Sequence, residues 1–148
     1  MKIFFLTSLL LLSACARPDY INPSEINGAQ NSTHQRCPLN FTQSGLCASV
    51  TWTQGPVSPA ESEFILKFWD ADKGADNGPY VDPIKTLSVI LWMPSMGHGS
   101  SPVTIEKIET GVFRVRRVYF IMPGEWEIRT FLKNGATVVD QATVNLTL

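Results

Sequence analysis

Residues 93–99, with the sequence Met-Pro-Ser-Met-Gly-His-Gly, hold two thioethers and one imidazole within six positions. Groups able to do chemistry are more concentrated here than anywhere else in the chain. Thioether sulfur and neutral imidazole suit a soft monovalent copper ion, whereas magnesium and calcium require oxygen ligands that this segment lacks. The residue types therefore indicate a Cu(I) site as the first functional hypothesis.

The candidate ligands of this segment are Met93, Met96 and His98. In an extended strand the last two point to one face and the first to the other, so all three converge only if the backbone bends. Pro94 fixes its own φ and Gly97 tolerates positive φ, which favours such a bend. A later loop supplies a fourth candidate ligand, Met122. The alternative is that the methionines pack in the core while His98 shapes a turn.

The first residues, 1–14, have the pattern of a cleavable secretory signal. A single lysine precedes an apolar run that is too short to span a bilayer. The sequence Leu-Ser-Ala-Cys that ends at Cys15 resembles the lipobox of bacterial lipoproteins, in which cleavage leaves the cysteine as a fatty-acylated N-terminus. We therefore expect Cys15 to carry a lipid anchor, and Ala16 favours outer-membrane sorting in a Gram-negative cell. The alternative is a secreted protein with Cys15 as a free thiol.

Residues 15–36 are rich in Asn, Ser, Gln and Pro, which predicts a flexible tether before a single domain at residues 37–148. The formal charge of the full chain is −1, and loss of Lys2 with the signal makes it −2. Because the chain has no basic run, it lacks the electrostatic pattern of a nucleic-acid-binding protein. We expect membrane contact through the lipid alone.

Cys37 and Cys47 remain as an even pair once Cys15 is assigned to the lipid. In an oxidising compartment such a pair is expected to form a disulfide, which would constrain the unfolded chain by about 3 kcal/mol. The alternative is a redox-active or metal-binding dithiol, but the spacing is unlike C-x-x-C. We predict a structural disulfide between them.

From residue 46 onward the chain alternates between strand patterns and turn signals. Seven strands are predicted, at residues 46–53, 63–70, 84–93, 103–109, 112–122, 125–133 and 137–148. Several alternate apolar and polar residues, as half-buried antiparallel strands do. In the last strand Val138, Ala142, Val144 and Leu146 are expected on one apolar face. Seven short strands in about 100 residues favour an all-β, immunoglobulin-like antiparallel sandwich.

The aromatic and acidic residues are predicted to have structural roles. The four tryptophans, Trp52, Trp69, Trp92 and Trp126, are expected to pack in the core. Trp92 directly precedes Met93, so its ring could instead lie near a bound cation. Residues 70–78 contain spaced carboxylates but do not fit the EF-hand pattern, so a solvated loop is expected there. Glu61 and Glu63 are expected at a sheet edge, where charge discourages pairing.

Three further motifs follow the methionine and histidine segment. They are Pro-Val at 102–103, Gly-Val-Phe-Arg-Val at 111–115 and Phe-Ile-Met-Pro-Gly-Glu-Trp-Glu-Ile at 120–128. Over residues 61–148 the chain resembles the YtkA-like and FixH-like family of extracytoplasmic domains. The resemblance implies a small β-sandwich held at the membrane and a role in copper handling or oxidase maturation. A lipobox cysteine stands where FixH proteins have a membrane-spanning helix.

Two functional hypotheses from different classes follow. The first is a lipid-anchored envelope protein that binds Cu(I) and assists copper handling or oxidase maturation. The second is a metal-free sandwich that binds an envelope protein partner. An enzyme is not expected, because His34 and His98 are the only imidazoles and no Ser-His-acid arrangement or phosphate-binding loop is present. No small-molecule substrate is indicated either.

Overall fold

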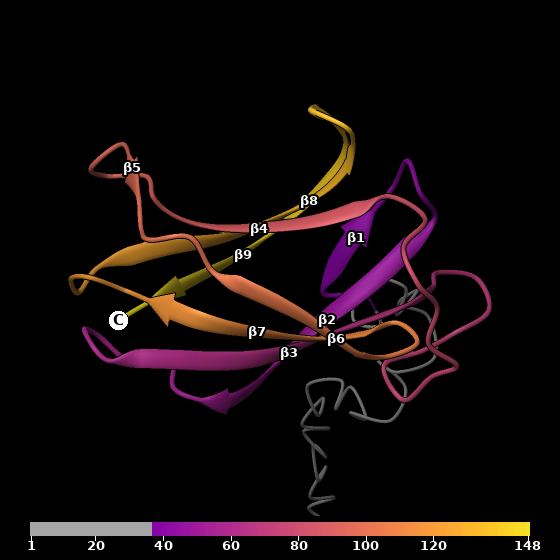
Figure 1. Ribbon diagram of the computed structural model, residues 1–148, viewed down its shortest axis with the longest axis horizontal. Coiled ribbons are helices and arrows are strands. Elements are labelled where there is room, and N and C mark those ends of the chain that lie inside the picture. Colours follow the sequence, from indigo (N-terminus) through magenta and orange to yellow (C-terminus); the bar gives the residue numbers. More distant parts are fainter. Residues whose placement is uncertain (1–36) are drawn as a thin grey trace, which may run out of the picture. The chain divides into compact units, whose positions relative to one another are not determined.

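The structure, a computed structural model, describes residues 37–148 (Figure 1). The predictions for the signal at residues 1–14, the lipidated Cys15 and the tether at residues 15–36 lie outside the described residues. Within residues 37–148, no helix is long and apolar enough to cross a membrane. The described part of the chain consists of strands and the turns and loops between them.

Nine strands make up the described part of the chain. They are β1 (Leu39–Phe41), β2 (Leu46–Gln54), β3 (Glu61–Asp70), β4 (Thr86–Met93), β5 (His98–Gly99), β6 (Thr104–Glu109), β7 (Val112–Tyr119), β8 (Glu125–Asn134) and β9 (Thr137–Thr147). All pairings are antiparallel, with the orders β1-β2-β3-β7-β6 and β5-β4-β8-β9 in the two sheets. The sheets form the two layers seen in Figure 1.

This topology confirms the predicted immunoglobulin-like sandwich. Strands β2, β3, β7 and β6 follow the ABED order of that fold, and β4, β8 and β9 follow the CFG order. All seven predicted strands are present, although β4 begins at Thr86 and β7 already ends at Tyr119. The two strands missed by the prediction, β1 and β5, contain three and two residues, too few to show a hydrophobic period.

The core lies between the two sheets and is rich in aromatic residues. The Trp52 ring lies 5.2 Å from Phe64 and 6.2 Å from Phe120, and Phe120 lies 5.5 Å from Trp126. These tilted and edge-to-face arrangements add to the 1.5–3 kcal/mol or so that burial of each large apolar side chain contributes. The prediction that Trp52 and Trp126 lie between the sheets is confirmed.

Trp69 is buried on the other side of its sheet. It belongs to the outward-facing positions of β3, yet only 1% of its surface is exposed. The loop of residues 71–85 covers it: Tyr80 forms a β-bridge with Trp69, and a Cβ atom at Gly74 would lie 2.7 Å from the Trp69 Cβ. The burial predicted for Trp69 is confirmed, but the predicted position between the sheets is wrong. The strand pattern indicates that the side chain is buried but not what covers it.

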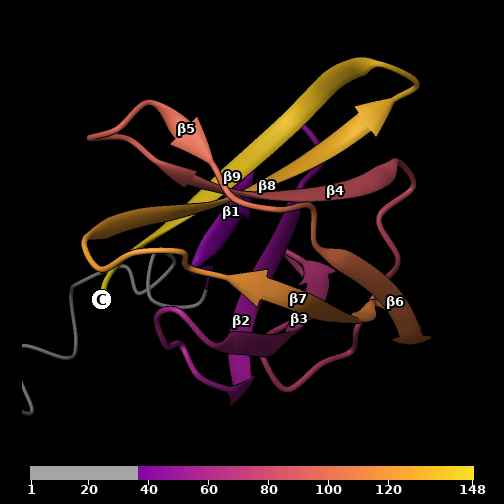
Figure 2. The same cartoon turned by 60° about the vertical axis from the view of Figure 1, so that its left-hand side comes forward.

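The last strand contains one extra residue that changes which side chains face inward. Leu132 pairs with Asp140 and the next residue of β8, Lys133, pairs with Val138, so the register shifts at this point. As a result Val138 is 44% exposed, contrary to the prediction, while Asp140 is buried. The Asp140 carboxylate accepts hydrogen bonds from the backbone N–H groups of Ser44 and Gln141 at 2.7 and 2.9 Å. Figure 2 shows the long hairpin that β8 and β9 form.

The predicted disulfide between Cys37 and Cys47 is present, with the two Cα atoms 5.0 Å apart. It joins the residues just before β1 to the start of β2, next to the loop of residues 71–85 that covers Trp69. Ser49 also donates a hydrogen bond to the Asp76 carboxylate in that loop. The disulfide and these contacts lie at the same end of the sandwich.

Candidate functional site

The opposite end of the sandwich carries the candidate metal ligands on a tight hairpin between β4 and β5 (Figure 1). The Met93 carbonyl accepts hydrogen bonds from the N–H groups of Met96 and Gly97 at 3.2 and 3.0 Å, and Gly97 has a φ of 67°. His98 then pairs directly with Met93 across the hairpin. The bend predicted from the glycines is therefore present.

This pairing brings Met93 and His98 together. Residues directly opposite each other in an antiparallel pair have their side chains on the same face, with Cβ atoms about 4.5–5.5 Å apart. Met93 is 4% exposed and belongs to the core, so the two side chains share the inner face at the end of the sandwich. The His98 Nδ1 atom lies 3.1 Å from the Gly99 carbonyl oxygen. In the tautomer that donates to this oxygen, Nε2 is left as the free ligand atom.

The loop before β8 packs against this hairpin. A Cβ atom at Gly124 would lie 2.7 Å from the Met93 Cε atom, so the end of the Met93 thioether rests against the Gly124 backbone. Met122, two residues earlier, is half-buried and packs against the core. Its carbonyl accepts a hydrogen bond from the Trp126 indole at 2.9 Å, which fixes the loop. The tertiary structure thus brings the Met122 loop beside Met93.

Met96 is placed differently from the other predicted ligands. It lies at the tip of the hairpin and is 59% exposed, whereas Met93 faces the core. The structure therefore brings Met93, His98 and the Met122 loop to one end of the sandwich and leaves Met96 in solvent above them. Only the thioether of Met96 is free to move without disturbing the packing of the core.

Other kinds of metal site are not indicated. Within residues 37–148, no three His, Cys, Asp or Glu side chains lie close enough to hold a metal ion. At residues 70–78, where the carboxylate spacing does not fit the EF-hand pattern, the Asp70 carboxylate accepts a hydrogen bond from the Asp72 N–H at 3.0 Å. This bond, together with the nearby Lys73 ammonium, lowers the pKa of Asp70. The Asp70 carboxylate thus holds the backbone of this segment, while the Asp76 carboxylate accepts a hydrogen bond from Ser49 of β2.

Trp92 lies on the outer face of the four-stranded sheet rather than in the core. The guanidinium of Arg129 stacks over its ring at 4.8 Å from the ring centroid. The prediction that Trp92 packs in the core was therefore wrong, and the cation near its ring is a neighbouring side chain. Arg129 also forms an ion pair with Glu127 at 2.6 Å, so this face carries a stacked and paired set of side chains.

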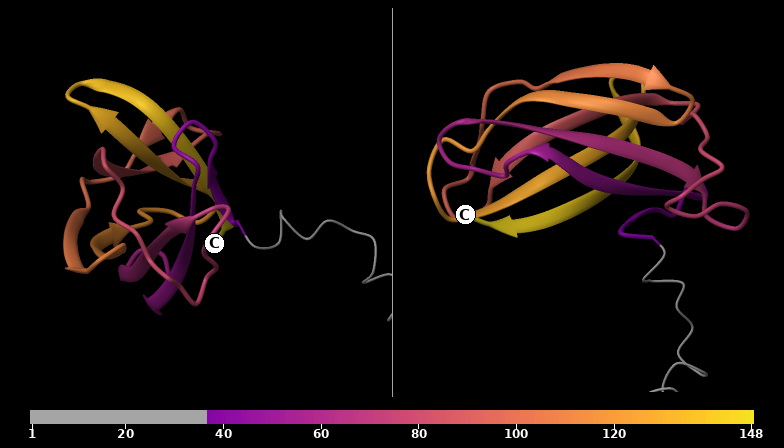
Figure 3. Two further views of the ribbon diagram at one scale, coloured as in Figure 1. Left: turned by 90° about the vertical axis from the view of Figure 1, so that its right-hand side faces the viewer. Right: turned by 90° about the horizontal axis from the view of Figure 1, so that it is seen from below.

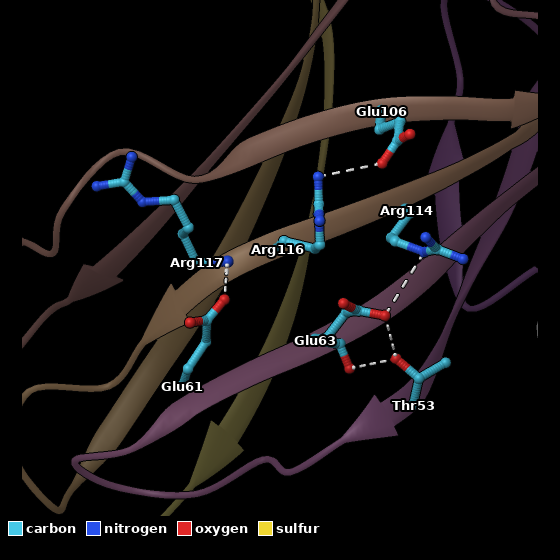
Figure 4. Close-up of polar contacts among 7 residues, drawn as sticks. All are labelled: Thr53, Glu61, Glu63, Glu106, Arg114, Arg116 and Arg117. Carbon is cyan, nitrogen blue, oxygen red and sulfur yellow. Dashed lines mark hydrogen bonds and ion pairs between the residues drawn. The ribbon is translucent and has the colours of Figure 1, made fainter.

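Charged residues cover the outer face of the five-stranded sheet (Figure 4). Glu61 and Glu63 belong to β3, the central strand of that sheet, so the prediction that they lie at an edge was wrong. Glu61 accepts hydrogen bonds from the Tyr119 hydroxyl at 2.8 Å and from the Arg117 N–H at 2.9 Å. Both bonds lower the pKa of Glu61, and the bond from Tyr119 has the larger effect. The hydrogen bond to the Glu61 carboxylate in turn raises the pKa of Tyr119.

Two ion pairs extend this charged face. Arg116 lies 3.2 Å from Glu106, and Arg114 lies 3.6 Å from Glu63, which is too long for a hydrogen bond. Exposed pairs of this kind contribute at most about 1 kcal/mol each. Arg117 adopts a φ of 58° at a bulge, and its guanidinium points away from Glu61 (Figure 4). The carboxylates of Glu61, Glu63 and Glu106 on this face are each engaged by a neighbouring side chain or backbone N–H group.

The YtkA-like family model matches residues 50–131, more than half of the 148-residue chain. The matched segment runs from β2 into β8 and contains the hairpin with Met93 and His98 as well as the Met122 loop. No curated protein and no solved structure matches the chain. The match indicates an extracytoplasmic domain, and it covers all the motifs on which the resemblance rested. The chain belongs to the YtkA-like family.

Proposed function

We propose that this protein binds Cu(I) at the end of the sandwich and serves as a lipid-anchored accessory for copper handling or oxidase maturation in the cell envelope. The observation that carries the proposal is the pairing of Met93 with His98, next to the loop that contains Met122. A sulfur and an imidazole nitrogen on one face of a hairpin are suitable ligands for a soft monovalent ion.

The proposed ligands are the His98 Nε2 atom and the sulfur atoms of Met93 and Met122. Burial supports this set, because Met93 is nearly inaccessible and Met122 is half-buried, which limits the access of water and oxidants. Met96, at the exposed tip, is the residue that closes over the ion or passes it on. Thioethers carry no charge, so the apo site has no buried charge that needs a partner.

The kinds of donor in the described residues support the choice of Cu(I). The described residues contain no cluster of carboxylates, cysteines and histidines that fits zinc or calcium. The two cysteines of the domain are joined in a disulfide and are unavailable as thiolate ligands. Thioethers and one imidazole are therefore the remaining soft donors, and they favour Cu(I) over the divalent ions.

The proposed location rests on the first residues of the chain and on the disulfide. Cleavage after residue 14 would leave Cys15 as a fatty-acylated N-terminus, and residues 15–36 would connect the anchor to the domain. The Cys37–Cys47 disulfide supports an oxidising compartment outside the cytoplasm. In a Gram-negative cell this predicts an outer-membrane lipoprotein that faces the periplasm.

A second candidate function is a metal-free module that binds an envelope protein. The outer face of the four-stranded sheet favours it, because Trp92 and Phe131 lie there with Arg129 and Lys133 over their rings at 4.8 and 5.6 Å. Ile90, on the same face, is 39% exposed. Aromatic residues and arginine are enriched in protein interfaces, so this surface is the one that a partner would contact.

Competition against a Cu(I) chelator tests the proposal. The full-length protein is titrated anaerobically with ascorbate as reductant, because a thiol reductant would open the disulfide and create new copper ligands. We expect one Cu(I) per chain and an affinity that falls about tenfold or more in His98→Ala and Met93→Leu, since each change removes one ligand. Met93→Leu retains the apolar volume, so a role in packing alone would leave its copper affinity unchanged.

Two further variants complete the experiment. Replacement of His34, the other histidine of the chain, by Ala should leave Cu(I) affinity unchanged and controls for non-specific imidazole binding. Met96→Leu should weaken binding less than Met93→Leu does, because Met96 lies outside the buried pair. Equal and negligible affinity in the wild type and all variants would reject the copper site and favour the interaction module.

A further inference from the structure

Four strands form the edges of the two sheets in the described part of the chain, namely β1, β6, β5 and β9. An edge strand presents unpaired N–H and C=O groups that can pair with another chain. Proteins usually prevent this by keeping edge strands short, by placing charged residues on them, or by adding bulges. The four edges of this sandwich differ sharply in how well they are protected.

Three of the edges carry such protection. Strand β1 has three residues and lies next to the disulfide, and β5 has only two. Strand β6 has six residues, of which Glu106, Lys107 and Glu109 are charged and exposed. Self-pairing of β6 would therefore require burial or close approach of charged side chains.

Strand β9 is longer and lacks this protection over most of its length. It has eleven residues and contains no lysine, arginine or proline. Its single charged residue, Asp140, points inward at the register shift, where Ser44, just after β1, donates its backbone N–H to the carboxylate. Residues 141–147 follow in continuous register with β8 and have no partner on their other side within residues 37–148. Figure 3 shows β9 as the outermost strand of its sheet.

The side chains of residues 141–147 are complementary to a second copy of themselves. In an antiparallel pair centred on Val144, Ala142 lies opposite Leu146 and Val144 opposite its own copy, all on the apolar face. On the polar face, Gln141 lies opposite Thr147 and Thr143 opposite Asn145. None of these residues is charged, so two copies approach without repulsion between like charges.

We propose that two copies of this protein pair through residues 141–147 of β9 to form one continuous sheet of eight strands around a two-fold axis. The contact is isologous and closes at a dimer, since both copies use the same segment of β9. The family match ends at residue 131, so β9 lies outside the matched segment and the dimer is a property argued for this chain by itself. The pairing does not depend on copper.

Sedimentation equilibrium of the metal-free, full-length protein in mild detergent tests the proposal. Thr143 and Asn145 are both exposed, and within the sheet they lie opposite Arg129 and Glu127. In the dimer each Thr143 would face Asn145 of the other copy. The double variant Thr143→Lys/Asn145→Lys puts like charges opposite each other twice and should weaken the dimer about tenfold or more.

A second variant at the same positions should act in the opposite direction. Thr143→Glu/Asn145→Lys places a glutamate opposite Arg129 and a lysine opposite Glu127 within each copy, and it creates two Glu–Lys pairs across the dimer. It should tighten the dimer about threefold or more, since each pair adds a few tenths of a kcal/mol to about 1 kcal/mol. A general effect of added charge would weaken the dimer in both variants and would reject the proposed register.

Ser88→Lys serves as the matched control. Residues 86–90 of β4 also lack a partner on one side within the described part of the chain, because β5 pairs only with Trp92 and Met93. The proposal requires Ser88→Lys to leave the dimer unchanged. A wild-type protein that stays monomeric up to about 100 μM, or a dimer that is lost in Ser88→Lys but kept in Thr143→Lys/Asn145→Lys, would overturn it.

Discussion

The two ends of the sandwich are built in opposite ways. One end is held by the Cys37–Cys47 disulfide and by the loop that covers Trp69. The other consists of a two-residue hairpin strand and a glycine-containing loop, which meet at Met93 and Gly124. The first end has many stabilising contacts and no free soft ligand, whereas the second has soft ligands and few cross-links. The proposed copper site thus lies at the end with fewer stabilising contacts.

The largest effect is expected from Trp69→Ala. Loss of this buried indole should lower the free energy of unfolding by about 3–5 kcal/mol, because a cavity forms under the loop of residues 71–85. Trp92→Ala is the control, since it removes a half-buried ring that stacks on Arg129 and should cost much less. Urea denaturation measures both. Equal losses of unfolding free energy in Trp69→Ala and Trp92→Ala would show that the two ends contribute equally to stability.

Removal of the disulfide should have the next largest effect. The double variant Cys37→Ser/Cys47→Ser, which leaves no free thiol within residues 37–148, should lose about 2–3 kcal/mol of stability at pH 7. Its affinity for Cu(I) should stay within about twofold of the wild type, because the bond lies at the opposite end from Met93. A large loss of copper affinity in a folded variant would contradict the separation of the two ends.

Gly124→Ala tests the functional end. Its Cβ atom would lie 2.7 Å from the Met93 Cε atom, and the φ of 134° is unfavourable for a residue with a side chain. We expect a loss of about 1–3 kcal/mol together with weaker Cu(I) binding, because Met93 must move. At Gly97 the same change meets no atom within 4 Å, so Gly97→Ala should cost about 1 kcal/mol through its backbone alone.

The charged face should produce a smaller, pH-dependent effect. Hydrogen bonds from Tyr119 and Arg117 lower the pKa of Glu61 below its ordinary value of 4.5. The folded state therefore binds fewer protons than the unfolded state, so the contribution of Glu61 is complete above about pH 4.5 and is lost as the pH falls through the lowered pKa. Glu61→Gln should be less stable at pH 7, and this deficit should disappear in strong acid.

A comparison with Tyr119→Phe separates the two hydrogen bonds to Glu61. This variant removes the first of the two causes and keeps the Arg117 N–H donor. Tyr119→Phe should therefore lose only part of the pH dependence of the free energy of unfolding that Glu61 provides. Denaturant titrations from pH 7 to about pH 3 measure the slopes, and parallel curves for all three proteins would exclude Glu61 as a source of the pH dependence.

The smallest effect on stability is expected from Met96→Leu. Met96 is 59% exposed at the hairpin tip, so the free energy of unfolding should change by less than about 0.5 kcal/mol. Any change in Cu(I) binding by this variant therefore reports a lost sulfur rather than a damaged fold. A clear loss of stability would show that the tip packs more tightly than its exposure indicates.

Local sequence patterns determined much of this protein. Alternation of apolar and polar residues predicted the seven longer strands, because each strand buries one face against the core. The cysteine count predicted the disulfide, and the glycines after Met93 predicted the bend. Each of these features depends on residues that are close in sequence or on a choice between few partners.

Tertiary structure decided the features that depend on strand pairing and on loops. The contact of Met93 with Gly124 joins segments that are about thirty residues apart in sequence, and they meet because β4 pairs with β8 in the four-stranded sheet. Likewise, one extra residue in β9 turned Val138 outward, and a long loop covered Trp69. A two-residue period in the sequence indicates which side chains share one face of a strand. The strand register and the packing of loops determine which residues those side chains contact.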